Sequence, residues 1–350
     1  MKAVVLKANE TLVWEEIPKP EVPPGWARIR VEMCGVCGSD IPRVFFHAVR
    51  KYPIVLGHEF VGVVESVGEG VENPRIGERV VGAPLLPCGK CAACREGNYS
   101  LCPHYSFLGS RQNGAMAEYV ALPSENALPL DESIPLKQAA TVEPSTVALH
   151  AFRLARFVAG KSVAVLGCGI IGLYAIQWAK ILGASHITAI SRGRAGLETA
   201  KTLGANQMVS VQGRGEDDIE RAFPAEGYDF VFESCGAEET MRLALRAVAR
   251  KGTVCLIGTP KRELTFPISV WERINRKECW ITGSWMSYSA PFPGEEWSMT
   301  IKAMESGQLQ LAPGMIAGIY PMSQADEAFR TARSGDAKGR ILLSNLETEF

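Results

Sequence analysis

"SVAVLGCGIIG", residues 162 to 172, joins an apolar run rich in β-branched residues to three glycines with GxGxxG spacing. The run from 162 to 166 predicts a buried strand, and residues 170 to 182 predict a helix that ends near Gly183. A second predicted strand, "HITAI", follows at residues 186 to 190. This order of elements is a βαβ unit, which binds the pyrophosphate of a dinucleotide at the N-terminus of its helix.

The glycine-rich turn marks the expected cofactor site. Two further predicted strands, at residues 228 to 234 and 252 to 258, would extend the sheet into a Rossmann fold. Residues 162 to 179 are uncharged and mostly apolar, as in a membrane span, but their glycine pattern favours the nucleotide-binding fold. The residues that we predict to bind the cofactor here are Gly167, Gly169, Ile170, Ile171 and Gly172.

The end of the second strand predicts which dinucleotide is bound. Ser191, Arg192 and Arg194 stand where a carboxylate usually accepts a hydrogen bond from the ribose 2′-hydroxyl of NAD. A hydroxyl and two guanidinium groups suit the 2′-phosphate of NADP better. We therefore favour NADP over NAD. The alternative is that both arginines are solvated loop residues.

Composition narrows the class of protein. A chain of 350 residues exceeds the size at which one core stops growing, so we expect two domains. Hydrophobic residues make up 47% and the net charge is −1, which disfavours nucleic acid and anionic lipid as partners. The N-terminus lacks the apolar stretch of a secretory signal, so we expect a cytoplasmic protein whose ten cysteines stay reduced.

Four of the cysteines lie within fifteen residues, in "CGKCAACREGNYSLC" from 88 to 102. Four thiolates at such spacings can surround one tetrahedral Zn²⁺ in a closed site that stabilises the fold. Two disulfides, an iron–sulfur cluster and simple packing are the alternatives, and we favour zinc because this polar, glycine-containing loop offers no core to pack into. The predicted structural ligands are Cys88, Cys91, Cys94 and Cys102.

A second set of candidate ligands comes from distant parts of the chain. Cys37 in "CGSD", His58 in "GHEF" and Glu143 in "VEP" form a mixed sulfur, nitrogen and oxygen set that leaves zinc an exchangeable position. Asp40 is the expected hydrogen-bond partner of the His58 imidazole. Cys34, which has apolar neighbours, is expected to be a small core residue instead.

These motifs carry a resemblance to a family. "CGSD", "GHEF", the four-cysteine loop, "VEP", GxGxxG and the closing "KGRILL" make the chain similar, along its whole length, to the zinc-dependent medium-chain alcohol and polyol dehydrogenases. "PLLPCGKCAAC", "YSFLGSRQNGAMAEY" and "GSWMSYSAPFPGEEW" resemble the galactitol-1-phosphate 5-dehydrogenase subgroup. That subgroup usually carries an aspartate at the position of Ser191, so the cofactor of this chain need not follow it.

The resemblance implies an α/β architecture. A β-rich GroES-like catalytic domain would comprise residues 1–148 and 286–350, and a doubly wound Rossmann domain would comprise residues 149–285. It also implies a homodimer or homotetramer joined through sheet edges near "GSWMSYS", and it adds Arg340 of "KGRILL" to the cofactor-binding residues.

The resemblance further implies a reaction. Cys37, His58 and Glu143 would hold a zinc ion whose Lewis acidity favours departure of a hydride from a polyol carbon to the nicotinamide. Ser39 would relay the proton, unless it is only a buried hydroxyl satisfied by backbone. Glu59 is expected to bind the metal during ligand exchange.

This chain departs from the family's usual proton relay. Pro42 stands where many relatives have a histidine after "CGSD", and His47 is no certain substitute for it.

A phosphorylated substrate would also need a cation. Arg43, six residues beyond Cys37, and Arg111, in a glycine-bounded loop, are the candidates for its phosphate, the alternative being surface ion pairs and a neutral polyol such as sorbitol. A metal-free or non-catalytic relative and a zinc-ribbon nucleic-acid binder are the other classes considered, and no basic face supports the last.

Overall fold

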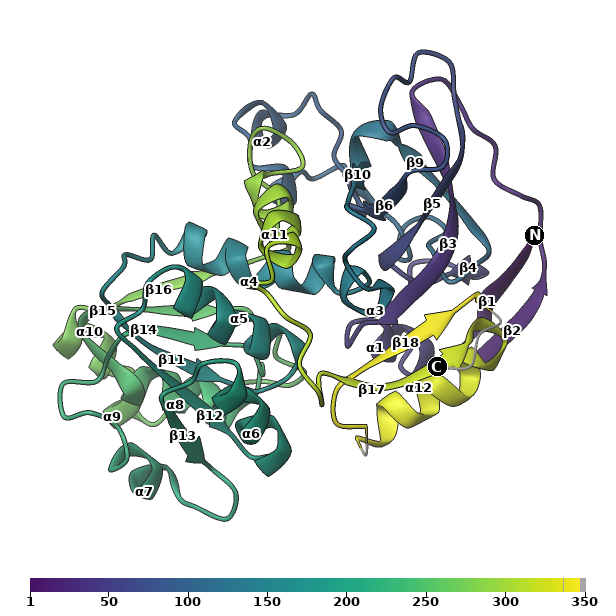
Figure 1. Cartoon of the computed structure of the whole chain (residues 1–350). Helices are drawn as coiled ribbons and strands as arrows, with labels where there is room; N and C mark the ends of the chain where they lie inside the picture. Colours follow the sequence, from purple (N-terminus) through teal and green to yellow (C-terminus); the bar gives the residue numbers. More distant parts are fainter. Residues whose placement is uncertain (336, 347–350) are drawn as a thin grey trace. The chain divides into compact units, whose positions relative to one another are not determined.

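The computed structural model describes residues 1–335 and 337–346, which form two units (Figure 1). Unit 1 contains Met1–Glu143, Tyr288–Leu311 and the described residues from Ile316 onward. Unit 2 contains Pro144–Ser287 and Ala312–Met315. The chain therefore leaves unit 1, builds unit 2 and returns to unit 1.

Unit 2 is built on a parallel sheet of six strands. Their order is β13-β12-β11-β14-β15-β16, so the chain starts in the middle, at β11, and moves first to one edge and then to the other. This is the doubly wound order of a Rossmann fold, as the glycine pattern predicts. The strands are β11 (Ser162–Leu166), β12 (His186–Ser191), β13 (Gln207–Ser210), β14 (Tyr228–Glu233), β15 (Val248–Leu256) and β16 (Trp280–Gly283).

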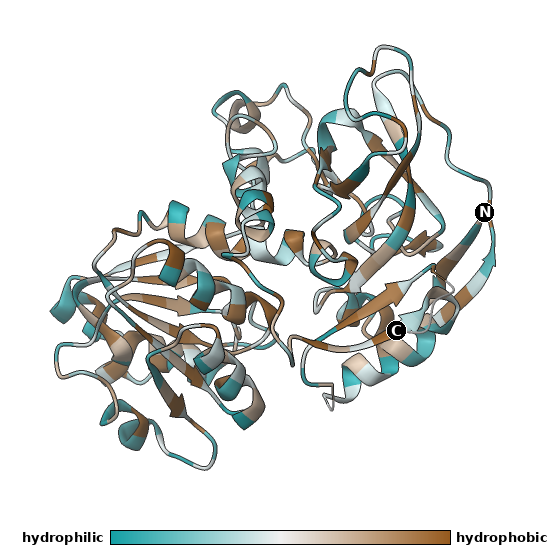
Figure 2. Cartoon of the chain, in the orientation of Figure 1, coloured by the Kyte–Doolittle hydropathy of each residue, from teal (hydrophilic) through white to brown (hydrophobic). Residues whose placement is uncertain are grey.

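The strands of this sheet are apolar because helices cover them. Figure 2 shows much of the sheet in brown, the colour of hydrophobic residues, and its core includes Ala164, Leu166, Val231 and Val254. The helix α4 (Val142–Leu154) runs from the end of unit 1 into unit 2. The other helices of unit 2 are α5 (Ile170–Ile181), α6 (Arg194–Thr202), α7 (Glu216–Glu220), α8 (Glu238–Ala247), α9 (Ile268–Trp271) and α10 (Arg273–Lys277).

Unit 1 is mostly β structure. Its largest sheet has the order β10-β6-β5-β3-β18-β17, and β9 also pairs with β3. A three-stranded sheet has the order β2-β1-β4, and β7 pairs with β8. The strands are β1 (Lys2–Ala8), β2 (Thr11–Glu16), β3 (Trp26–Val36), β4 (Ile54–Val55), β5 (Glu59–Val67), β6 (Arg79–Gly82), β7 (Leu85–Leu86), β8 (Ser106–Phe107), β9 (Tyr119–Pro123), β10 (Ala127–Pro129), β17 (Ile316–Pro321) and β18 (Arg340–Ser344).

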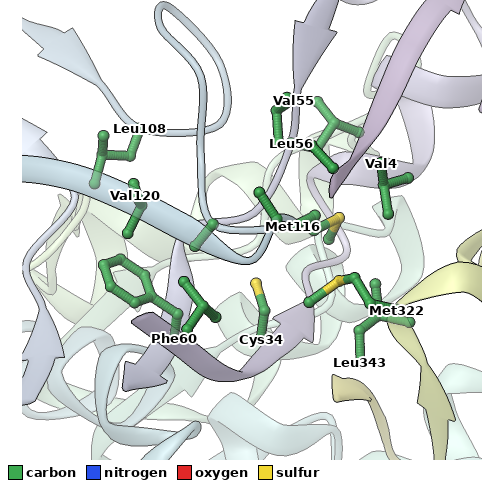
Figure 3. Close-up of a cluster of buried hydrophobic side chains, with 14 of the residues drawn as sticks. Val4, Cys34, Val55, Leu56, Phe60, Leu108, Met116, Val120, Met322 and Leu343 are labelled. Carbon is green, nitrogen blue, oxygen red and sulfur yellow. The ribbon is translucent and has the colours of Figure 1, made fainter. Parts of the chain in front are cut away.

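Short helices and one apolar core complete unit 1. Figure 3 shows part of that core, in which Cys34 lies among Phe60, Met116 and Leu343. Cys34 is fully buried there, so the prediction that it is a core residue is confirmed. The helices are α1 (Asp40–Phe45), α2 (Ala92–Arg95), α3 (Leu136–Ala139), α11 (Glu295–Glu305) and α12 (Ala325–Ser334), with 3₁₀ turns at Tyr99–Leu101, Ser124–Asn126 and Met322–Gln324.

The register of three neighbouring strands positions the candidate site. β3 pairs with β5 so that Gly35 lies opposite Glu59, which brings the residue after β3, Cys37, next to the start of β5. β18 pairs with the other side of β3 and places Ile341 opposite Val36. Residues at the ends of all three strands therefore meet at one place. In the part of the chain that the structure describes, no helix is both long and apolar enough to cross a membrane.

Candidate active site and metal centres

Three of the predicted ligands converge where β3 and β5 meet. Cys37 follows the end of β3, His58 precedes β5, and Glu59 is the first residue of β5. One ligand atom from each of these residues lies within 4.8 Å of the other two. A thiolate, an imidazole and a carboxylate in this arrangement can coordinate one divalent metal ion, and zinc accepts all three ligand types.

The electrostatics of this cluster fit a bound cation. Glu59 is 1% exposed, and within the described part of the chain neither its carboxylate oxygens nor His58 Nδ1 has a hydrogen-bond partner. Burial raises the pKa of Glu59 to about 8, and the Arg340 guanidinium, 3.2 Å from its Oε1, offsets that effect only in part. Buried acceptors without partners are costly. A metal ion would satisfy them.

Glu143 reaches the same region from a different element. It lies in the first turn of α4, where a carboxylate interacts favourably with the helix dipole. It stands outside the group of three converging ligand atoms. Burial raises its pKa to about 7, and the next largest cause is the negative charge of Glu59. The structure thus brings Cys37, His58 and Glu59 together and places Glu143 within electrostatic range of them.

The hydroxyl of Ser39 lies beside the thiol of Cys37, and the residue is exposed to solvent. Ser39 Oγ is 3.3 Å from Cys37 Sγ, and the residue is exposed. The alternative of a buried serine satisfied by backbone is therefore wrong. Pro42 lies within α1, and His47 is exposed just beyond that helix, with its backbone N–H donating to Asn9.

The hydrogen bond predicted between Asp40 and His58 is not formed. His58 Nδ1 is 3.7 Å from Asp40 Oδ1, which is too long for a hydrogen bond, and Nδ1 has no other partner. The reason is a competing contact. Arg43 Nη1 lies 2.6 Å from the same Asp40 oxygen and 3.2 Å from Ser39 Oγ. Spacing of three and four residues along α1 could have predicted both bonds.

Two other predicted cations, Arg340 and Arg111, also have partners in the protein. Arg340, predicted for the cofactor, donates to the Val36 carbonyl at 2.8 Å as well as pairing with Glu59. Arg111 donates to the Tyr105 carbonyl at 2.6 Å and lies over the Tyr105 ring. Sequence reasoning missed Phe107, whose ring packs edge-on against His58 at 5.5 Å between centroids.

The four predicted structural ligands also converge. One sulfur from each of Cys88, Cys91, Cys94 and Cys102 lies within 4.8 Å of the others, and Cys91 Sγ is 3.5 Å from Cys94 Sγ. All ten cysteines are free thiols, so the disulfide alternative is not adopted. Hydrogen bonds from the backbone of Lys90 and Cys91 lower the pKa of Cys88 to about 6. Four thiols that lie this close together suit structural zinc.

The glycine-rich turn requires glycine at two of its three motif positions, Gly167 and Gly172. Gly167 has φ +100°, and a Cβ there would lie 2.6 Å from Cys235 Sγ; a Cβ on Gly172 would lie 1.9 Å from the Gly167 carbonyl. Only glycine fits either position. The turn follows β11, next to β14, where the strand order reverses and dinucleotides bind.

The residues predicted to choose the cofactor lie at the end of β12. Arg192 and Arg194 are exposed, and Ser191 is half-buried. Burial raises the pKa of the Cys168 thiol, within the glycine-rich turn, to about 11, and the nearby Ser191 side chain offsets that effect in part. The two guanidinium groups remain in solvent.

Unit 2 contains a Rossmann sheet, and the β-rich unit 1 carries a mixed cluster of cysteine, histidine and glutamate. This combination is typical of metal-dependent nicotinamide oxidoreductases. Comparison with known proteins specifies the class further. Residues 23–132 match the family profile of the alcohol dehydrogenase GroES-like domain, and residues 171–306 match that of the zinc-binding dehydrogenases.

Individual relatives agree with this result. Galactitol 1-phosphate 5-dehydrogenase of Escherichia coli is 35% identical over 97% of this chain and 96% of its own. L-threonine 3-dehydrogenase of Streptomyces avermitilis is 35% identical over 98% of this chain and 99% of its own. The crystal structure of galactitol-1-phosphate dehydrogenase from Escherichia coli superposes with a TM-score of 0.93, at 35% identity, over 98% of this chain and 100% of that one.

Two further solved structures contain cofactors. A zinc-binding dehydrogenase from Sinorhizobium meliloti bound to NADP has a TM-score of 0.88 at 26% identity, and covers 98% of each chain. An alcohol dehydrogenase from Escherichia coli complexed with NADH has a TM-score of 0.87 at 27% identity, over 98% of this chain and 99% of that one. The chain belongs to the zinc-dependent medium-chain dehydrogenase family.

The two clusters predict two metal ions of different lability. Cys94→Ser should remove one ion per chain and lower the unfolding temperature, because a closed thiolate site is coupled to folding. Cys37→Ser should remove the other ion with a much smaller effect on unfolding. The measurements are metal analysis and thermal unfolding, and Cys279→Ser, outside both clusters, is the control. At most one ion in active enzyme, or unchanged stability in Cys94→Ser, would contradict the assignment.

Proposed function

We propose that the protein is a zinc- and NAD(P)-dependent dehydrogenase of a sugar alcohol, and that the alcohol is a polyol phosphate such as galactitol 1-phosphate. The observation that carries the proposal is the convergence of Cys37, His58 and Glu59, with buried acceptors that lack partners. The 35% identity to a galactitol 1-phosphate 5-dehydrogenase supports the substrate class. An unphosphorylated polyol or another secondary alcohol is the second candidate, because an L-threonine 3-dehydrogenase is also 35% identical to this chain.

The proposed catalytic ligands are Cys37, His58 and Glu143, with Glu59 as a ligand during exchange. A zinc ion held there would supply Lewis acidity at the substrate oxygen. The half-buried thiol of Cys37 and the buried ring of His58 come from elements fixed by strand pairing, so their positions are set before substrate binds. Glu143 and Glu59 keep the cluster rich in negative charge, which retains a divalent cation.

We propose that Ser39 moves the proton of the substrate hydroxyl to solvent. Its hydroxyl lies beside Cys37 on one side and is exposed on the other, so it can accept a proton and pass it to water. This short route would replace the family's histidine, whose position Pro42 occupies.

NADP is the proposed cofactor, with NAD as the alternative. Gly169 is the N-cap of α5 and a Cβ there would meet no atom within 4 Å, so we place the pyrophosphate there, beside the backbone of Ile170 and Ile171. Gly167 and Gly172 would bind it through the tight turn that only glycine allows. Ser191, Arg192 and Arg194 offer a hydroxyl and two exposed cations to a 2′-phosphate. Related structures contain NADP in one case and NADH in another, so both cofactors occur on this fold. Arg340 is proposed to turn from Glu59 to the cofactor when it binds.

We further propose that unit 1 acts as the catalytic domain and unit 2 as the NAD(P)-binding domain of a cytoplasmic homodimer or homotetramer. The supporting feature for assembly is the edge strand β16, where Trp280 is 70% exposed and Ile281 is 42% exposed. Large apolar side chains on an unpaired sheet edge favour pairing with a second copy. The four-cysteine cluster is proposed to hold the second, structural zinc ion.

Cofactor preference tests the assignment at the end of β12. Wild-type enzyme should have a higher kcat/KM with NADP than with NAD. Ser191→Asp should weaken the NADP reaction by about 1 to 3 kcal/mol in transition-state free energy, because a carboxylate repels the 2′-phosphate. Ser191→Asn has the same size without the charge and serves as control. Equal or better kcat/KM with NAD in the wild type would refute the proposed phosphate contacts.

Substrate preference tests whether the natural substrate carries a phosphate group. The wild type should favour galactitol 1-phosphate over galactitol, and Arg111→Ala should lose about 1.5 to 3 kcal/mol in kcat/KM only with the phosphorylated substrate. Arg95→Ala is the control, because Arg95 also donates Nη1 to a backbone carbonyl, at 2.6 Å. A wild type indifferent to the phosphate, or an equal loss on both substrates in Arg111→Ala, would leave the neutral polyol as the substrate.

A further inference from the structure

Arg43 makes its contacts next to the metal cluster and not on the open surface. Its Nη1 lies 2.6 Å from Asp40 Oδ1 and 3.2 Å from Ser39 Oγ. Ser39 is the N-cap of α1, Asp40 is its first residue, and Arg43 follows one turn later. Residues three and four apart on a helix face the same side, so the backbone of α1 brings the three side chains together.

Both partners of Arg43 touch the proposed metal ligands. Ser39 Oγ lies 3.3 Å from Cys37 Sγ. Asp40 Oδ2 accepts the backbone N–H of Cys37 at 3.2 Å, and Asp40 Oδ1 is 3.7 Å from His58 Nδ1. One guanidinium nitrogen therefore sets the position of two groups that in turn border Cys37 and His58.

Because these groups are buried, breaking the ion pair between Arg43 and Asp40 would be energetically costly. Asp40 is 0% exposed and the side chain of Arg43 is 19% exposed, so their ion pair is shielded from water. A buried carboxylate that loses its cation is costly and moves toward any other donor in reach. Besides the backbone N–H of Cys37, which Asp40 already accepts, His58 Nδ1 lies 3.7 Å from Asp40 Oδ1. Without Arg43, we expect Asp40 to turn toward the His58 ring and the Ser39 hydroxyl to lose its fixed rotamer.

We propose that Arg43 is a positioning residue for the dehydrogenase reaction. It holds the Ser39 hydroxyl against Cys37 and holds Asp40 at a fixed distance from His58. The inference rests on the proposed function, since the serine it orients is the proposed proton relay. Among the described residues, no group bonds to Nε or Nη2 of Arg43, so this edge stays available to an anionic substrate.

The experiment compares Arg43→Met with Arg43→Lys and with the control Arg50→Ala, which removes an exposed arginine of the neighbouring loop. Arg43→Met should lower kcat on the order of 10- to 100-fold with both galactitol and galactitol 1-phosphate, because the relay group is misplaced in both reactions. A further loss of kcat that occurs only with galactitol 1-phosphate would show that Nε and Nη2 of Arg43 contact the substrate phosphate. Arg43→Lys, with the charge but a shorter reach, should recover part of kcat. Adding Ser39→Ala to Arg43→Met should lower kcat little further, since both changes disable the same pair of interacting side chains.

A second measurement does not depend on turnover. Co²⁺ is loaded in place of zinc at the exchangeable site, and the thiolate-to-cobalt absorption band reports the geometry at Cys37. Arg43→Met should shift this band, whereas Arg50→Ala should leave it unchanged. Arg43→Lys provides the comparison if Arg43→Met does not fold.

The two measurements separate the possible failures. A wild type that oxidises no polyol, combined with a shifted band in Arg43→Met, would overturn the proposed function and uphold the positioning role. A loss confined to galactitol 1-phosphate with an unshifted band would make Arg43 a phosphate ligand only. Unchanged kcat and an unchanged band, or equal effects in Arg50→Ala, would overturn the inference.

Discussion

The antiparallel pairing of β3 with β5 is the constraint on which the candidate active site depends. Because Gly35 lies opposite Glu59, Cys37 comes to rest beside His58 although twenty residues separate them in the chain. A Cβ on Gly35 would lie 2.5 Å from a Glu59 carboxylate oxygen, so a larger residue there would displace the Glu59 carboxylate from its present position. A shift of the β3–β5 register by one residue would turn these side chains to opposite faces of the sheet, so they could no longer converge.

That pairing also brings acidic side chains close together, and nearby arginines neutralise only part of their negative charge. Cys37, Asp40, Glu59 and Glu143 crowd acidic groups into a region largely shielded from water, and burial raises the pKa of both glutamates. Arg340 on β18 and Arg43 on α1 each supply one positive charge, to Glu59 and Asp40 respectively. Acceptors on Glu59 and His58 still lack hydrogen-bond partners. A site that keeps such groups unpaired is preorganised for a cation.

Much of this account could be predicted from local sequence patterns. The glycine spacing after an apolar run predicts the Rossmann sheet, and the spacing of four cysteines predicts their convergence, because both patterns act within one short segment. The side-chain contacts of the metal cluster could not be predicted in the same way. Asp40 was expected to bond to His58, yet it pairs with Arg43. The spacing along α1 allows the contact with Arg43, but the spacing alone does not tell which of two neighbouring partners a buried carboxylate takes. The ion pair between Arg340 and Glu59 joins residues far apart in the chain, so no local pattern predicts it.

X-ray absorption at the zinc edge of active, purified enzyme distinguishes the two proposed metal sites by their ligands. We expect two zinc environments per chain: one with four sulfur ligands at about 2.3 Å, and one with a single sulfur and the rest nitrogen or oxygen at about 2.0–2.2 Å. Cys94→Ser should leave only the mixed environment, and Cys37→Ser only the sulfur one. A spectrum fitted by sulfur ligands alone in active enzyme would contradict the proposal that Cys37, His58 and their neighbouring glutamates form the catalytic metal site.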